Sequence, residues 1–160
     1  MKALDQIEPR TAIESVPFNI TQSGSYYLTK NLNFSAASGN AITITVSNVT
    51  LDLMGFTLSS TSAVTEDGIH INGGVRNVAV RNGVIAGNTV VTISGAAPTQ
   101  NWLVAAAGFN IGINGSVSPT PTGRNFNDLR ISGCRTVGLE AGERVRHREC
   151  HRHSKRQYGH

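Results

Sequence analysis

Residues 41–58, AITITVSNVTLDLMGFTL, decide the fold of this 160-residue chain. Apolar residues alternate there with Thr, Asp and Ser, the period-two pattern of a strand with one buried face. Breaks in the alternation divide the stretch into three short strands, whose apolar positions are Ile42 and Ile44, then Val49, Leu51 and Leu53, then Phe56 and Leu58. The stretch therefore predicts an all-β structure with frequent turns.

Two later stretches repeat this pattern. Residues 68–86 read GIHINGGVRNVAVRNGVIA, and residues 128–141 read DLRISGCRTVGLEA, a fainter copy. When the copies are aligned on the apolar residue that follows a small one, the spacings are 27, 44 and 26 residues, between Ile42, Ile69, Ile113 and Leu139. A period near 27 with an insertion in one turn predicts the coils of a solenoid.

The alignment also predicts which side chains point outward. Because stacked strands lie about 4.8 Å apart, Asp52 is expected one rung from Arg81. We interpret these two residues as an exposed ion pair between rungs, which contributes little to stability. Thr43, His70 and Glu140 are expected to share a second outward column.

The corners between strands have their own residue types. Asn48 and Asn77 take the same place before the second strand of their coils, where the left-handed conformation is tolerated by Asn. Their stacked amides are expected to hydrogen-bond along the stack, as in Asn ladders. Gly55 and Gly83 are expected to form the next corner with a positive φ.

We divide the chain into three parts. Residues 1–40 are expected to form an N-terminal lead-in and cap, and residues 41–142 the coils. An insertion without charged residues at 88–110 is expected to form a loop or hairpin that pairs residues 89–93 with 102–105. Residues 143–160 match nothing before them, and we expect this basic tail to be foreign to the repeat and disordered.

The net charge of +4 comes from the tail, because residues 143–160 hold six Lys or Arg and two Glu. The rest of the chain is neutral, so it has no basic footprint for specific nucleic-acid binding. Two cysteines make no disulfide framework. No apolar run is long enough to span a membrane, and the first residues contain no apolar segment of a signal peptide.

Five segments together resemble a known family: ITQSGSYYLTKNL, NAITITVSNVTLDLMGFTLSS, DGIHI, RNVAVRNGVIAG and GFNIGI. They are similar to bacterial right-handed parallel β-helix proteins of the pectate-lyase-like superfamily, of the uncharacterised secreted type. The resemblance covers residues 3–142. It implies a right-handed, single-stranded parallel β-helix of about four coils, located outside the cell or on its surface. Family members continue with further coils where this chain becomes Arg/His-rich, so we interpret it as truncated.

The same resemblance implies two kinds of enzyme chemistry to consider. Pectate-lyase-like enzymes hold Ca²⁺ with carboxylates beside an Arg or Lys base, but here the acidic residues fall in different columns: Asp52, Glu66, Asp67, Asp128 and Glu140. Hydrolases of the superfamily use paired carboxylates, with neighbouring Asp residues on successive strands and a His. Asp67 and His70 match only a fragment of that pattern, without the Asp pair. We therefore assign no catalytic residue and no cofactor, and expect Ca²⁺ only if the protein is lyase-like.

Three residues of the insertion suggest a sugar platform. The ring of Trp102 could pack on a sugar while Gln100 and Asn101 bond its hydroxyls. Alternatively, Trp102 anchors the insertion on the coils. In the tail, the spacings of His147, Cys150, His151 and His153 resemble those of metal ligands; an Arg/His-rich segment produces such clusters by chance, and we assign no metal site.

The sequence thus predicts a non-catalytic secreted or cell-surface module that is structural or binds polysaccharide. The alternative is a remnant of a carbohydrate-active enzyme, either a polysaccharide lyase or a glycoside hydrolase. The candidate ligand-binding residues are Asp67, His70, Gln100, Asn101 and Trp102. We also expect self-association through an uncapped edge near residues 129–141.

Overall fold

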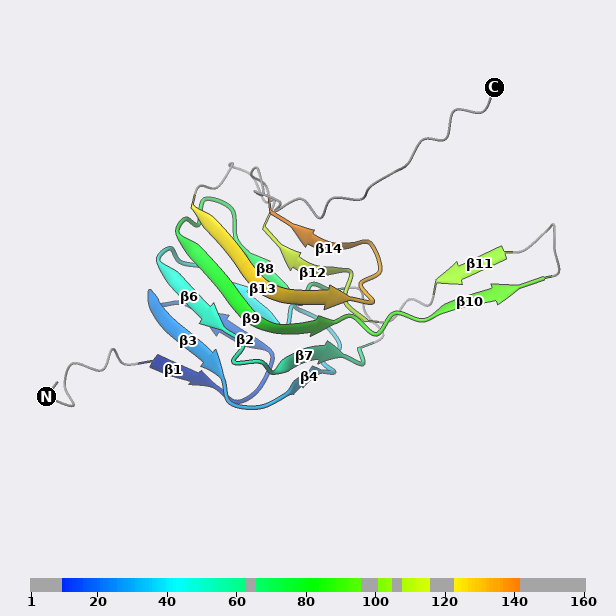
Figure 1. Ribbon diagram of the computed structural model, residues 1–160, viewed down its shortest axis with the longest axis horizontal. Helices are drawn as coiled ribbons and strands as arrows, with labels where there is room; N and C mark the ends of the chain where they lie inside the picture. The colour runs from blue at the N-terminus through cyan, green and yellow to red at the C-terminus, as the bar shows by residue number, and fades with distance from the viewer. Residues whose placement is uncertain (1–9, 63–65, 96–100, 105–107, 116–122, 142–160) are drawn as a thin grey trace, which may run out of the picture.

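The computed structural model describes residues 10–62, 66–95, 101–104, 108–115 and 123–141 (Figure 1). All regular structure in these ranges is β-strand, and they contain no helix. The strands are β1 (Arg10–Ile13), β2 (Phe18–Ile20), β3 (Gly24–Leu28), β4 (Leu32–Phe34), β5 (Ile42–Ile44), β6 (Val49–Asp52), β7 (Thr57–Ser60), β8 (Ile69–Ile71), β9 (Val78–Ala86), β10 (Val91–Ser94), β11 (Asn101–Val104), β12 (Ile111–Asn114), β13 (Arg124–Ser132) and β14 (Val137–Glu140).

Two parallel sheets make up the body of the molecule. One has the order β14-β12-β8-β5-β2, and the other has the order β1-β3-β6-β9-β7-β4 with β13 also on β9. Figure 1 shows β3, β6, β9 and β13 side by side. The chain passes back and forth between the two sheets, with two consecutive strands in the larger sheet at β3 and β4 and at β6 and β7, and each return adds parallel strands to the existing ladders. The fold is therefore all-β with parallel sheets, an arrangement compatible with a solenoid.

The strand register confirms the alignment of the repeats. Ile69 lies opposite Ile42 on one side and opposite Ile113 on the other, and Ile113 lies opposite Leu139. The spacings of 27, 44 and 26 residues are thus the lengths of chain between successive strands of the five-stranded sheet. The longest of these connections, between β8 and β12, contains the predicted antiparallel hairpin of β10 and β11.

The core lies between the sheets and consists mainly of aliphatic residues stacked from strand to strand, together with the buried rings of Phe34 and Phe109. Val49, Leu51 and Leu53 are at most 1% exposed, as their alternation predicted. Val78 and Val80 lie opposite Val49 and Leu51 on the next strand. Each fully buried side chain of this size contributes about 1.5–3 kcal/mol to folding, so these columns supply most of the hydrophobic stabilisation.

The Asn corner is confirmed. Asn48 and Asn77 have φ values of 61° and 54°. The Asn77 side-chain amide donates to Asn48 Oδ1 over 3.0 Å, which is the predicted ladder contact. At the next level Gly123 takes the corresponding place: its φ is +72°, and a Cβ there would collide with Asn77 Oδ1.

At the second corner the prediction is right for Gly55 and wrong for Gly83. Gly55 has a φ of 80°, but the positive φ of the next level belongs to Asn82, at 58°. A Cβ on Gly83 would collide with the Leu53 side chain and the Phe56 carbonyl. Glycine is therefore needed at position 83 for close packing between levels.

The N-terminal part takes part in the same sheets. Strands β1 and β3 pair in parallel, as do β2 and β5, so strands from residues 10–34 continue both ladders. At the other end, β13 pairs with β9 and β14 with β12; within the described ranges neither has a partner on its other side. The basic tail at 143–160 lies outside the described residues.

Candidate functional site

One polar row runs across the outer side of the five-stranded sheet. The register aligns Thr43 with His70, His70 with Asn114, and Asn114 with Glu140. This confirms the predicted column of Thr43, His70 and Glu140, and Asn19 of β2 extends it beyond Thr43. We call these five residues the polar row. Neighbouring positions in such a row are about 4.8 Å apart.

Asp67 organises the middle of the polar row. It lies just before β8 and is 8% exposed. Its Oδ2 is 2.9 Å from His70 Nδ1 and accepts a 2.8 Å hydrogen bond from the Asn114 amide. The Asp67 backbone N–H in turn donates to Asn40 Oδ1 over 3.0 Å. A single buried carboxylate therefore holds two side chains from different strands.

This contact sets the chemistry of the imidazole. With Asp67 ionised, the proton of a neutral His70 belongs on Nδ1, and Nε2 is left as an acceptor on the other side of the ring. The side chain of His70 is one-quarter exposed, so part of the ring is accessible to a ligand. The arrangement offers one oriented imidazole and one oriented amide, both suited to hydroxyl groups.

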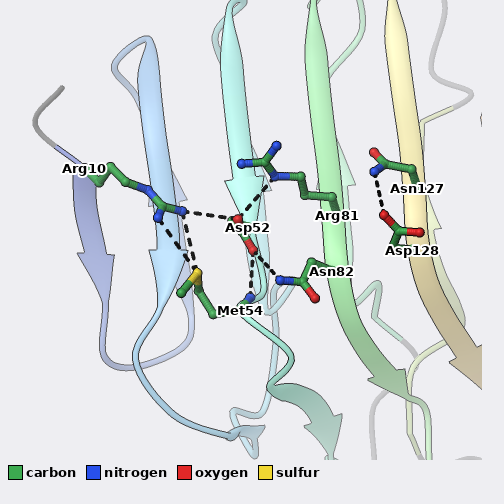
Figure 2. A network of polar contacts seen from close by, with 7 residues as sticks. All are labelled: Arg10, Asp52, Met54, Arg81, Asn82, Asn127 and Asp128. Carbon is green, nitrogen blue, oxygen red and sulfur yellow. Dashed lines mark hydrogen bonds and ion pairs between the residues drawn. The ribbon is translucent and has the colours of Figure 1, made fainter. Parts of the chain in front are cut away.

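A second polar cluster lies on the seven-stranded sheet (Figure 2). Asp52 Oδ2 is 3.2 Å from Arg81 Nε and 3.3 Å from a terminal nitrogen of Arg10. Asp52 Oδ1 accepts hydrogen bonds from the Met54 backbone N–H, at 2.9 Å, and from the Asn82 amide, at 3.2 Å. The predicted contact between Asp52 and Arg81 on neighbouring strands is confirmed. The prediction that the pair is exposed is wrong for its carboxylate, because Asp52 is only 6% exposed.

These contacts determine the ionisation of Asp52. Burial alone would raise its pKa, but the Met54 N–H, the Asn82 amide and the guanidinium groups of Arg81 and Arg10 together hold the pKa below the ordinary carboxyl value. Asp52 is therefore an ionised carboxylate surrounded by donors.

Arg10 is the member of this cluster that the repeat pattern missed. It comes from β1, and its guanidinium lies 5.0 Å from the centre of the Tyr27 ring on the way to Asp52. Residue 10 precedes the aligned coils, so no repeat position indicated its partner. Asn114 was also missed, although it follows Ile113 as His70 follows Ile69, and this offset could have revealed it.

The structure brings together two of the five predicted site residues, Asp67 and His70. Trp102 and Asn101 lie in β11, opposite Ile93 and Ser94 of β10. Figure 1 shows this hairpin extending away from the two sheets. Gln100 lies outside the described residues, as do the His and Cys residues of the tail.

Within the described ranges, no three His, Cys, Asp or Glu side chains come together as a metal site would require. The same ranges contain no helix with the length and apolar character of a membrane span. Comparisons of the chain with protein-family models, curated proteins and solved structures found no match.

Proposed function

We propose that the chain is a right-handed parallel β-helix of the pectate-lyase-like type, with about four coils, that acts outside the cell or on its surface as a non-catalytic polysaccharide-binding module. The parallel order of both sheets supports the fold, because each return of the chain stacks new strands in parallel on those of the previous return. The function rests on the polar row, not on the fold.

The observation that carries the proposal is the contact of Asp67 with both His70 and Asn114. Binding sites for sugars combine a few fixed polar groups that accept and donate to hydroxyls. Asp67 fixes such groups before any ligand arrives, which reduces the ordering cost of binding. Across its strands, from Asn19 to Glu140, the polar row covers about 19 Å. A glycan lying along the stack would meet several rungs in succession.

In this proposal, the hairpin is a second contact region for the glycan. Trp102 would offer an aromatic face, with Gln100 and Asn101 as hydroxyl partners. The alternative role of Trp102 is to anchor the hairpin. The two roles differ in outcome, since Trp102→Ala would weaken glycan binding in the first and lower only stability in the second.

A glycan array followed by calorimetric titration of the best ligand tests the proposal. His70→Ala and Asn114→Ala should each weaken binding at least about tenfold, the equivalent of about 1.4 kcal/mol. Asn125→Ala is the matched control, because Asn125 is an exposed amide on the other sheet. Absence of binding to any glycan would overturn the proposal and leave a structural spacer.

One observation favours a second function, a remnant of a polysaccharide lyase or glycoside hydrolase. An imidazole held at Nδ1 by a carboxylate is a recurring form of general base, and Asp67 holds His70 in this way. Product analysis of polyuronate and neutral glycans, with Ca²⁺ or a chelator, tests this reading. Cleavage that His70→Ala abolishes would replace the non-catalytic proposal.

A further inference from the structure

The outer face of the seven-stranded sheet carries a cationic group that the polar row does not use. We call Arg10 and Arg81 the arginine pair. Both contact Oδ2 of Asp52 from opposite sides: Arg81 lies on the neighbouring strand β9, and Arg10 reaches across β3 from β1. Two positive charges thus share one carboxylate, while the second carboxylate drawn in Figure 2, Asp128, contacts Asn127 and neither arginine.

The two carboxylate oxygens of Asp52 are already shared among four donor groups, so neither arginine has this carboxylate to itself. Its Oδ1 accepts from Met54 and Asn82, and its Oδ2 faces both guanidinium groups. Arg81 uses Nε for this contact, and within the described ranges no other side-chain hydrogen bond of Arg81 is found. The Arg81 side chain is 47% exposed. Its terminal nitrogens are therefore oriented donors that face solvent, and in Figure 2 they point towards β6.

The surface beside these donors is formed by small side chains. The outward residues two positions before Asp52 and Arg81 are Thr50 and Ala79, which lie opposite each other. Both side chains are short, and Thr50 adds a hydroxyl on the strand next to that of Arg81. Donors from Arg81, Arg10 and Thr50 thus come from three strands, and guanidinium groups form strong charge-assisted hydrogen bonds with the oxygens of phosphate-like anions.

We propose that the arginine pair, with Thr50, binds a tetrahedral oxoanion, namely a phosphate or sulfate group. The terminal nitrogens of Arg81 make the direct contacts, and Asp52 fixes the guanidinium plane through Nε. The proposal does not depend on glycan binding by the polar row. Asp128 is the opposing charge nearby: it follows Asn127, the residue opposite Arg81, and accepts from the Asn127 amide. We expect this carboxylate to limit the affinity to the millimolar range.

The test is a titration with sodium phosphate and sodium sulfate at pH 8 and constant ionic strength, observed by NMR at the Arg81 Nε–H and the Thr50 amide. We expect saturable shifts with both salts and none with chloride. Arg81→Gln should abolish saturation, whereas Arg130→Gln, an exposed arginine elsewhere in β13, should leave it unchanged. Asp128→Asn should tighten binding about threefold, because it removes the opposing charge.

Two further arms keep the test decisive. Arg81→Lys retains the charge and loses the planar fork, so a folded Arg81→Lys protein should bind at least fivefold more weakly. Dextran sulfate against neutral dextran distinguishes a sulfated polymer from a free anion as the source of the group. Shifts that chloride reproduces, or that survive in Arg81→Gln, would mean an adventitious ion only and overturn the proposal.

Discussion

Asp52 of β6 and Arg81 of β9 face each other across neighbouring strands, with 3.2 Å between Oδ2 and Nε. The two partners differ in environment, since the carboxylate is buried and the guanidinium is about half exposed. A buried carboxylate is costly unless donors surround it. The backbone N–H of Met54 and the Asn82 amide supply such donors, so the stability of this corner depends on more than the ion pair.

Removal of the Asp52 charge should therefore destabilise the fold. Asp52→Asn preserves the size of the side chain but places an amide among donors, and we expect the free energy of unfolding at pH 7 to fall by about 2 kcal/mol. Urea unfolding followed by circular dichroism measures this loss. The matched control is Asp128→Asn, because Asp128 is exposed and its φ of 53° suits Asn. The control should change stability by less than about 0.5 kcal/mol, and equal losses in both variants would contradict the role of burial.

The stability of the protein should depend on acid pH through Asp52. The folded-state pKa of this carboxyl lies below the ordinary value of 3.8, since its hydrogen bonds and the two arginines outweigh the effect of burial. Above 3.8 the carboxyl is ionised in both states and its stabilisation is complete. As pH falls below this value the unfolded chain takes up the proton first, so the stabilisation declines, and it is gone below the folded-state pKa.

The measurement compares wild type with Asp52→Asn between pH 7 and pH 2. The difference in unfolding free energy should be constant above about pH 5 and shrink towards pH 2. A difference that stays constant over the whole range would show that the pKa of Asp52 is not lowered in the folded state.

The repeat pattern predicted the register because local alternation determines it. A strand shifted by one residue would turn its apolar positions outward, so Ile42 and Ile69 had to align once both faced the core. The polar row follows from the same constraint, because Thr43 and His70 come directly after those isoleucines. Asn48 and Asn77 were predictable for a different reason, namely that few residue types tolerate a positive φ.

Other features depend on contacts that no local pattern encodes. Arg10 reaches Asp52 only because β1 pairs with β3, and β1 has no counterpart in the aligned repeats. The burial of Asp52 was missed because an outward position suggests exposure, whereas neighbouring side chains cover it. At the second corner, Gly83 was predicted to have a positive φ because glycine is common in turns. The structure instead requires glycine there because the Leu53 side chain, from the preceding coil repeat, lies too close for a Cβ.

The Asn ladder can be separated into a backbone and an amide contribution. Asn77→Ala places a residue that tolerates the left-handed conformation less well than Asn at a φ of 54°, and it removes the hydrogen bond to Asn48 Oδ1. We expect the free energy of unfolding to fall by about 2 kcal/mol. Asn77→Gly removes the amide but accepts the φ, so its loss should be about 1 kcal/mol smaller. Urea unfolding of the two variants gives the comparison. Equal losses would mean that conformation contributes nothing at this corner.

Gly83 and Gly55 provide the sharpest comparison between close packing and backbone strain. Gly83→Ala introduces a Cβ against Leu53 and the Phe56 carbonyl without a positive φ, and we expect a loss of about 3 kcal/mol, the upper range for overpacking. Gly55→Ala meets no atom within 4 Å but must adopt a φ of +80°, so its loss should be only about 1–2 kcal/mol. Thermal and urea unfolding rank the two variants. The reverse order would show that the levels separate easily at position 83 and that the corner itself is the more rigid element.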